Sequence, residues 1–275
     1  MESNEWSKLF QSIGIRKHVV YIVGLGPGTP ELITLKAYSI LNHADVCLYT
    51  GTLLSPELKQ IIQEKCKECY DTGRMDVEDI VNVIVENYRK GRLVAWFHDG
   101  CPTVYGGLWP ILARLRELGI PYEIVPGVTS VSAAAAVLGI ELTVPEKSQT
   151  VIITRVSKRT PKPANEDLSK LAKCGTVVLL LSVQNIEQVY EELRKGGLDD
   201  NVDVAIVQYA TWRDKQKVIK CKLGELVKRV KEEHINRCAV IIVGPCVSDS
   251  MWNFTHLEYV YSKDRKYQQQ KSHEH

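Results

Sequence analysis

The chain has 275 residues, of which 44% are hydrophobic and 25% are charged, and its formal net charge at pH 7 is +2. This length allows one large domain or two modest ones, and the near-neutral charge offers no concentrated basic face for nucleic acid. The longest apolar runs, residues 176–181 and 238–243, fall far short of the roughly 20 residues that a membrane helix requires.

The predicted elements alternate between strands and helices along the chain. The first strand covers residues 19–23, and after a glycine loop Thr29 is placed to cap a helix with Pro30 in its first turn. Further β-branched or apolar runs predict strands at residues 46–49, 93–97, 122–125, 150–155, 176–181, 204–209, 217–222 and 239–243. Apolar residues at helical spacing predict helices at residues 30–43, 77–88, 108–118, 130–138, 185–193 and 224–233. Asp76 is expected to cap the second of these helices, and Gly91 to end it.

This alternation indicates an α/β protein with mostly parallel sheets and helices on their faces. Residues 142–149 include Pro145 and show no periodicity, which predicts a domain boundary. We therefore expect two α/β domains, at residues 18–141 and 146–260. Residues 1–17 form an N-terminal extension in this interpretation, and residues 261–275 form a polar tail that we expect to be disordered.

The first glycine loop, residues 24–28 (GLGPG), invites comparison with dinucleotide-binding loops. That fingerprint needs glycine or alanine where Thr29 stands, and a carboxylate about 20 residues later. Residues 48–51 carry no carboxylate, which disfavours an NAD site, and no Gly-Lys-Ser/Thr follows for a phosphate loop. Pro27 also removes a backbone donor. Two interpretations stay open here: a tight turn without a ligand, or a loop that shapes an adjacent pocket.

Several segments, taken in order, resemble the signatures of the tetrapyrrole (corrin/porphyrin) methylase family. Three of them are residues 23–34 (VGLGPGTPELIT), 98–106 (HDGCPTVYG) and 126–136 (PGVTSVSAAAA). Further segments resemble the family's precorrin-4 C11-methyltransferase branch, at residues 142–145 (LTVP), 149–155 (QTVIITR), 159–161 (RTP) and 209–212 (YATW). The resemblance extends over about residues 19–247, nearly the whole chain.

The resemblance implies a homodimer of two-domain chains that bind S-adenosyl-methionine in the cleft between the domains. The implied reaction transfers a methyl group to C11 of (cobalt-)precorrin-4 in cobalamin biosynthesis, giving (cobalt-)precorrin-5 and S-adenosyl-homocysteine. Carried over position by position, the cofactor contacts are Pro27, Asp99, Gly100, Cys101, Val104, Thr129, Ser130, Leu181 and Ala210.

Methyl transfer from a sulfonium is an in-line displacement that demands proximity and alignment, not a side-chain nucleophile. We therefore assign no catalytic residue. A substrate rich in carboxylates favours Arg and Lys partners, and a basic run contains Arg155, Lys158, Arg159 and Lys162, although a solvated loop explains that run equally simply. Candidates to line a substrate trough, each with core packing or a surface role as the alternative, are Tyr49, Arg74, His98, Tyr105 and Trp212.

Two positions depart from the patterns of related enzymes. Cys101 stands where the family has the aspartate of a Gly-Asp-Pro loop, and a thiol accepts hydrogen bonds poorly. We hypothesise that Asp99, or backbone groups, take over that contact. Gly51 stands where related uroporphyrinogen methylases place an aspartate thought to serve as base. This speaks against the uroporphyrinogen reaction and leaves the proton acceptor unassigned.

The eight cysteines occupy positions 47, 66, 69, 101, 174, 221, 238 and 246. Their scatter favours buried thiols in a reducing cytoplasm over a disulfide framework, and residues 1–17 lack the layout of a signal peptide. Cys66 and Cys69 form a single Cys-x-x-Cys without the second pair of a zinc site, so we expect no metal.

Four other functions remain as alternatives to C11 methylation. Within the family these are a C-methyltransferase acting on a different precorrin carbon and a diphthine-synthase-like methyltransferase. Outside it, an NAD-dependent oxidoreductase is disfavoured by the glycine loop. A binding module that has lost turnover is suggested by Cys101.

Overall fold

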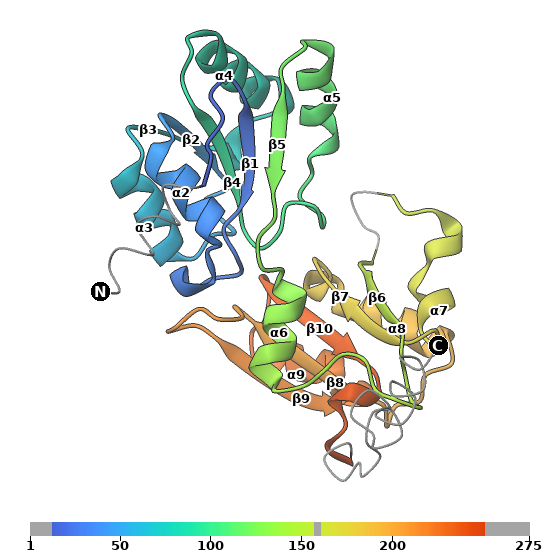
Figure 1. Ribbon diagram of the computed structural model, residues 1–275. Coiled ribbons are helices and arrows are strands. Elements are labelled where there is room, and N and C mark those ends of the chain that lie inside the picture. The colour runs from blue at the N-terminus through green and yellow to red at the C-terminus, as the bar shows by residue number, and fades with distance from the viewer. Residues whose placement is uncertain (1–12, 157–160, 251–275) are drawn as a thin grey trace, which may run out of the picture. The chain divides into compact units, whose positions relative to one another are not determined.

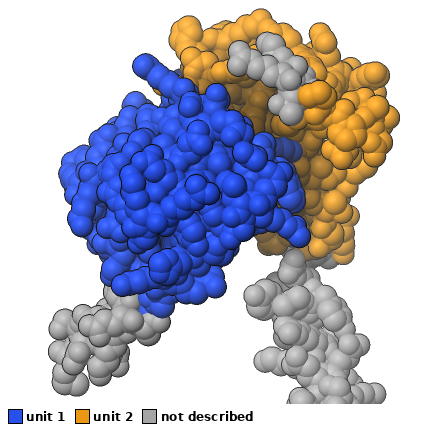
Figure 2. Space-filling view, turned by 90° about the horizontal axis from the view of Figure 1, so that it is seen from above, with its two compact units in different colours: residues 1–138, 207–217 blue, residues 139–206, 218–275 orange. Residues whose placement is uncertain are grey.

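The structure is a computed structural model that describes residues 13–156 and 161–250 (Figure 1). It divides into two compact units, Met1–Leu138 with Val207–Lys217 and Gly139–Ile206 with Val218–His275, coloured separately in Figure 2. The domain limits expected from the sequence do not place residues 207–217 with the first unit. The extension at residues 1–17 lies mostly outside the described residues, and the tail at residues 261–275 lies entirely outside them.

The first unit contains a five-stranded parallel sheet in the order β3-β2-β4-β1-β5. Its strands are β1 (Val20–Gly24), β2 (Val46–Tyr49), β3 (Glu68–Asp71), β4 (Val94–His98) and β5 (Tyr122–Val125). Its helices are α2 (Leu35–His43), α3 (Pro56–Lys65), α4 (Val77–Arg89), α5 (Trp109–Glu117) and α6 (Ser130–Leu138), with 3₁₀ turns η1 (Pro30–Leu32) and η2 (Thr72–Arg74). The sheet is parallel, as the alternating pattern predicted.

Helices cover both faces of this sheet (Figure 1). Tyr21 and Val23 of β1 pack into a cluster with α2 and α3, whereas Val20 and Ile22 pack into a second cluster with α4 and α5. All four side chains are fully buried. Burial on both faces explains why β1 is a continuous apolar run, without alternation of polar and apolar residues.

The first predicted helix is wrong at its start. Thr29 makes no side-chain cap; a short 3₁₀ turn follows it, and the α-helix begins only at Leu35, where the Thr34 hydroxyl accepts from the Ala37 N–H at 3.2 Å. The Thr29 N–H instead donates to the Thr211 hydroxyl at 3.3 Å, a contact 182 residues away along the chain. The predicted Asp76 cap is confirmed as a full capping box.

The second unit contains a five-stranded sheet in the order β6-β7-β10-β8-β9. Its strands are β6 (Val151–Thr154), β7 (Thr176–Leu179), β8 (Asp203–Gln208), β9 (Lys217–Lys222) and β10 (Ala239–Val243). Its helices are α7 (Leu168–Leu171), α8 (Ile186–Lys195) and α9 (Leu226–Glu232), with 3₁₀ turns η3 (Ala164–Glu166), η4 (Val183–Asn185), η5 (Leu223–Glu225) and η6 (Pro245–Val247). Since β10 runs antiparallel to β7, this sheet is mixed and not wholly parallel.

Three elements have no counterpart among the predicted ones: α3, β3 and α7. The strand β3 lies at the sheet edge and none of its residues is buried, so it lacks a strong apolar pattern. Helix α3 buries only Leu58 and Ile62, and α7 spans a single turn. Because these elements bury few residues, their sequences lack the apolar periodicity from which helices and strands are predicted.

The expectation that the cysteines are thiols is wrong for one pair. Cys47 of β2 and Cys66, which follows α3, form a disulfide that joins the strand to the helix end. The other six cysteines, all within the described residues, form no disulfide. Within residues 13–156 and 161–250, no cluster of His, Cys, Asp or Glu is arranged to hold a metal, and no helix could span a membrane.

Candidate functional site

Three glycines bring three loops into backbone contact at the carboxyl edge of the first sheet. Gly24 ends β1, Gly100 follows β4 and Gly127 follows β5, and these three strands are neighbours. A Cβ atom on Gly24 would lie 2.6 Å from the Gly100 oxygen and 2.6 Å from the Gly127 nitrogen. A Cβ atom on Gly127 would lie 2.2 Å from the same Gly100 oxygen. Only glycine permits this approach, and carboxyl edges of parallel sheets are where ligands bind.

Two of these loops are also joined by hydrogen bonds. The Gly100 N–H donates to the Gly26 oxygen at 2.8 Å, and the Gly26 N–H donates back to the Gly100 oxygen at 3.2 Å. Both residues have a positive φ angle, which is +85° for Gly26 and +60° for Gly100. The first glycine loop is thus fixed against the 98–106 loop, which favours the pocket-shaping interpretation over an isolated turn.

The segment at residues 207–217 packs on the first glycine loop. The Trp212 indole N–H donates to the Pro27 oxygen at 3.1 Å, and a Cβ atom on Gly28 would lie 2.3 Å from Trp212 Cδ1. A Cβ atom there would also lie 3.0 Å from the Ala210 oxygen, so Pro27 and Ala210 share one neighbourhood. Trp212, a candidate for the substrate trough, therefore supports the glycine loop.

Cys101 occupies a turn that stabilises a negatively charged sulfur. Its Sγ lies 3.1 Å from the Thr103 hydroxyl oxygen. Partial burial acts to raise the pKa of Cys101, but the Thr103 hydroxyl and the N–H groups of Thr103 and Gly127 outweigh it and lower that pKa. The sulfur thus accepts hydrogen bonds from backbone N–H groups, and an aspartate carboxylate at this position would be suited to accept the same bonds.

The residues just before Cys101 are more enclosed. Burial raises the pKa of the Asp99 carboxyl and lowers the pKa of His98 to about 4, which leaves the imidazole neutral at neutral pH. The His98 ring packs 4.2 Å from the Trp96 ring, centroid to centroid, and its Nε2 has no hydrogen-bond partner. This position matches the core-packing alternative for His98.

The remaining cofactor candidates of the first unit lie beside the same glycines. A Cβ atom on Gly100 would lie 3.6 Å from the Ser130 nitrogen, at the start of α6, and the Thr129 oxygen accepts from Ala133 in that helix. Val104 donates its N–H to the Cys101 oxygen. Leu181 belongs to the second unit, where it follows β7 with φ +53° and 63% of its surface exposed.

This set of residues fits an adenosyl group. It offers backbone amides, hydroxyls and apolar surface with room beside Gly100, where a Cβ atom would meet nothing closer than 3.6 Å.

A second group of polar residues lies where β2 and β3 end. The Asp71 Oδ1 accepts from the N–H groups of Gly51 and Gly73, each at 3.0 Å, and Lys59 Nζ lies 4.0 Å from Oδ2. Arg74 ends the η2 turn in the same stretch, whereas Tyr49 is 4% exposed and accepts from Gln63. Sequence analysis did not single out Asp71, because its closeness to Gly51 depends on the pairing of β2 with β3.

Of the other candidates, Tyr105 is exposed, whereas Arg155 and Lys162 form hydrogen bonds within their own loop. Tyr105 is 44% exposed with φ +57°, an unusual conformation of the type often found at functional sites. Arg155 and Lys162 bond to backbone oxygens and a hydroxyl of their own loop, including Pro161 and Thr154. Lys158 and Arg159 lie outside the described residues.

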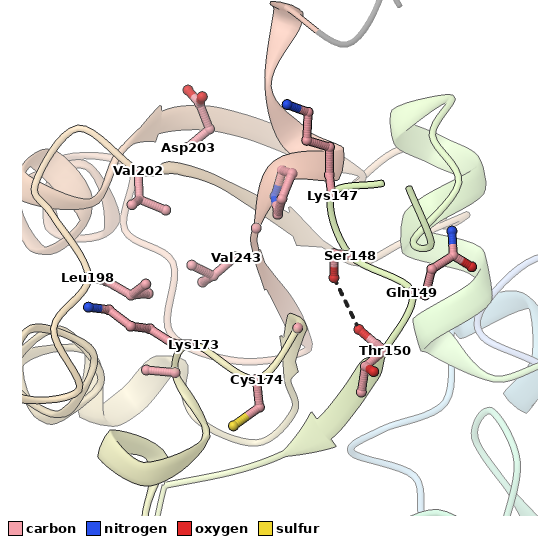
Figure 3. A pocket seen from close by; sticks show the side chains of 14 residues that line it. Lys147, Ser148, Gln149, Thr150, Lys173, Cys174, Leu198, Val202, Asp203 and Val243 are labelled. Carbon is pink, nitrogen blue, oxygen red and sulfur yellow. Dashed lines mark hydrogen bonds between the residues drawn. The ribbon is translucent and has the colours of Figure 1, made fainter. Parts of the chain in front are cut away.

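The second unit also holds a hollow of about 720 Å³, shown in Figure 3. It is lined by Thr150 before β6, Gly175 before β7 and Gly244 after β10, with Lys147 and Lys173 at its rim. Leu181 follows the opposite end of β7. None of the predicted site residues lines this hollow.

Comparison with known proteins relates the whole arrangement to one family. Residues 19–227 match the family model of the Tetrapyrrole (Corrin/Porphyrin) Methylases. A cobalt-precorrin-4 C(11)-methyltransferase from Methanocaldococcus jannaschii is 40% identical over 255 residues, covering 92% of this chain and 96% of the relative. A solved cobalt precorrin-4 methyltransferase is 37% identical with a TM-score of 0.79, covering 84% and 96% of the two chains. The Thermus thermophilus uroporphyrin-III C-methyltransferase, solved with S-adenosyl homocysteine, is 29% identical with a TM-score of 0.71, covering 83% and 98%.

Proposed function

The chain belongs to the tetrapyrrole (corrin/porphyrin) methylase family, and on that premise we propose that it methylates C11 of (cobalt-)precorrin-4. The observation that carries this proposal is the 40% identity over 92% of the chain to a relative named for that reaction. The products are (cobalt-)precorrin-5 and S-adenosyl-homocysteine. A homodimer and a cytoplasmic location belong to the same proposal.

S-adenosyl-methionine, when bound, supplies an electrophilic methyl group. We infer that the loops at Pro27, at residues 99–104 and at residues 129–130 hold it, together with Ala210. The Gly24, Gly100 and Gly127 contacts support this, because they fix three of these loops in one arrangement. Preorganisation of this kind supplies the alignment that an in-line displacement needs.

The uroporphyrinogen reaction is the nearest competing function within the family. A Cβ atom at position 51 would lie 2.3 Å from Asp71 Oδ2, so an aspartate side chain at this position has no room while Asp71 keeps its place. This observation favours the precorrin-4 branch over enzymes that carry a carboxylate at that position.

Calorimetry with S-adenosyl-methionine, S-adenosyl-homocysteine and NAD tests the cofactor assignment. We expect binding of the first two and no heat from NAD. Tight NAD binding without a response to either adenosyl compound would contradict the proposal.

A further inference from the structure

The Asp71 carboxylate presents two oxygens in different situations. Its Oδ1 is held by two backbone donors, the N–H groups of Gly51 and Gly73. Among the described residues, its Oδ2 has Lys59 Nζ, at 4.0 Å, as an ion-pair partner. The two hydrogen bonds to Oδ1 fix the orientation of the carboxylate, and the Asp71 side chain as a whole is 43% exposed.

Gly51 leaves room for the Asp71 Oδ2 atom, because glycine has no side chain. Oδ2 lies 2.3 Å from the point where a Cβ atom of residue 51 would stand. Any side chain there would displace the carboxylate or cover it. The Asp71 carboxylate can therefore occupy this position only because residue 51 has no side chain.

Strand pairing places this carboxylate on the functional edge of the sheet. Tyr49 at the end of β2 is the register partner of Asp71 at the end of β3, and all strands of the sheet are parallel. The carboxyl ends of β2 and β3 therefore lie on the same edge as the Gly24, Gly100 and Gly127 loops. A reactive group here lies where substrates bind in such sheets.

The charge balance of the reaction requires a proton acceptor. When the electron pair of a macrocycle carbon forms the new C–CH₃ bond, the S–CH₃ bond breaks and its pair stays on sulfur. The macrocycle then carries the positive charge that the sulfonium has lost. A proton must leave the macrocycle to restore its original charge.

We propose that Asp71 Oδ2 accepts this proton and passes it to solvent, which makes Asp71 a catalytic residue of the methyl transfer. The inference rests on the proposed function, since it needs a substrate that loses a proton on methylation. Lys59 of α3 and Arg74 of η2 are the charged groups that face Asp71. Both are cations, which keep the carboxylate ionised between turnovers.

The pKa of Asp71 is consistent with this role. Partial burial acts to raise it, but the Gly73 and Gly51 N–H groups and the charges of Lys59 and Arg74 outweigh burial and lower it. Asp71 is therefore ionised throughout the neutral range, which is the form that accepts a proton, and the same lowered pKa makes the carboxylate a weaker base than a free aspartate. Titration of Asp71 should therefore not lower the wild-type rate within the neutral range.

The test compares Asp71→Asn with the wild type in single turnovers of cobalt-precorrin-4 and S-adenosyl-methionine. The amide still accepts at Oδ1, so the fold is retained, but the basic oxygen is lost. We expect a fall in rate of about 10²- to 10⁴-fold, a rate that rises with pH, and unchanged dissociation constants for S-adenosyl-homocysteine and cobalt-precorrin-4. Asp199→Asn is the matched control, because Asp199 also accepts the N–H two residues later, from Asn201, and should leave all values unchanged.

A second variant separates a chemical from a structural role. Formate should restore part of the lost rate in Asp71→Ala, in a saturable way, and should have no effect on Asp199→Ala. If the wild type is active, an Asp71→Asn rate within threefold of the wild-type rate would overturn the inference but not the proposed function. Loss of S-adenosyl-homocysteine binding in Asp71→Asn would have the same consequence. A folded wild type that transfers no methyl group would overturn both the inference and the proposed function.

Discussion

The Trp212 indole N–H donates to the Pro27 oxygen at 3.1 Å, which ties residues 207–217 to the first glycine loop. Trp212→Phe keeps an aromatic ring, although a smaller one, and removes this bond, which is worth about 1 kcal/mol. We expect roughly fivefold weaker binding of S-adenosyl-homocysteine, measured by calorimetry. Trp212→Ala should weaken binding further, because the ring contact with Gly28 is lost as well. Unchanged affinity in both variants would show that the loop does not depend on this segment.

The contact of the Gly127 backbone with Gly100 predicts a severe effect of one added methyl group. In Gly127→Ala the new Cβ would overlap the Gly100 oxygen at 2.2 Å. We expect a loss of about 3 kcal/mol or more in the free energy of unfolding, together with loss of S-adenosyl-homocysteine binding. Gly14→Ala is the control, because a Cβ there meets nothing within 4 Å. Equal stability of the two variants in urea titrations would contradict this account.

Cys101 should be more reactive than the more deeply buried cysteines. Its lowered pKa means a larger thiolate fraction at any given pH, whereas burial raises the pKa of Cys221 to about 11 and also raises that of Cys246. Iodoacetamide at pH 7.5, followed by mass spectrometry, should modify Cys101 before these two. Bound S-adenosyl-homocysteine should slow the modification of Cys101. Modification at the same rate with and without this ligand would place Cys101 outside the cofactor site.

His98 should make the fold sensitive to acid. Its pKa is about 4 in the folded chain, below the ordinary value of 6.5, so the unfolded chain binds more protons between these values. Stability is therefore lost as the pH falls from about 6.5 to about 4, by on the order of 3 kcal/mol. His98→Phe should remove this part of the pH dependence in urea titrations, and His234→Gln should not. A slope that persists in His98→Phe would assign it to other groups.

Locally determined features could be predicted from the sequence. The Asp76 capping box, helix α6 and strand β5 depend on residues within one element, and the structure confirms them at their predicted positions. The family was also identifiable, because its motifs are continuous segments. The cofactor candidates carried over from those motifs remain predictions.

Features that depend on distant residues could not be predicted in this way. Thr29 makes no cap: its hydroxyl donates to the Glu31 carboxylate, and its N–H donates to Thr211, 182 residues away along the chain. The relation of Asp71 to Gly51 requires the pairing of β2 with β3, an edge strand without a clear pattern. The Cys47–Cys66 disulfide likewise depends on how α3 packs against β2.

The position of the transferred methyl group tests the central claim most directly. The protein would be incubated with cobalt-precorrin-4 and S-adenosyl-methionine carrying a ¹³C-labelled methyl group, and the product examined by NMR. The account predicts a single labelled methyl group at C11 of the macrocycle. Label at another carbon, or none in the macrocycle while the protein binds S-adenosyl-homocysteine, would contradict it.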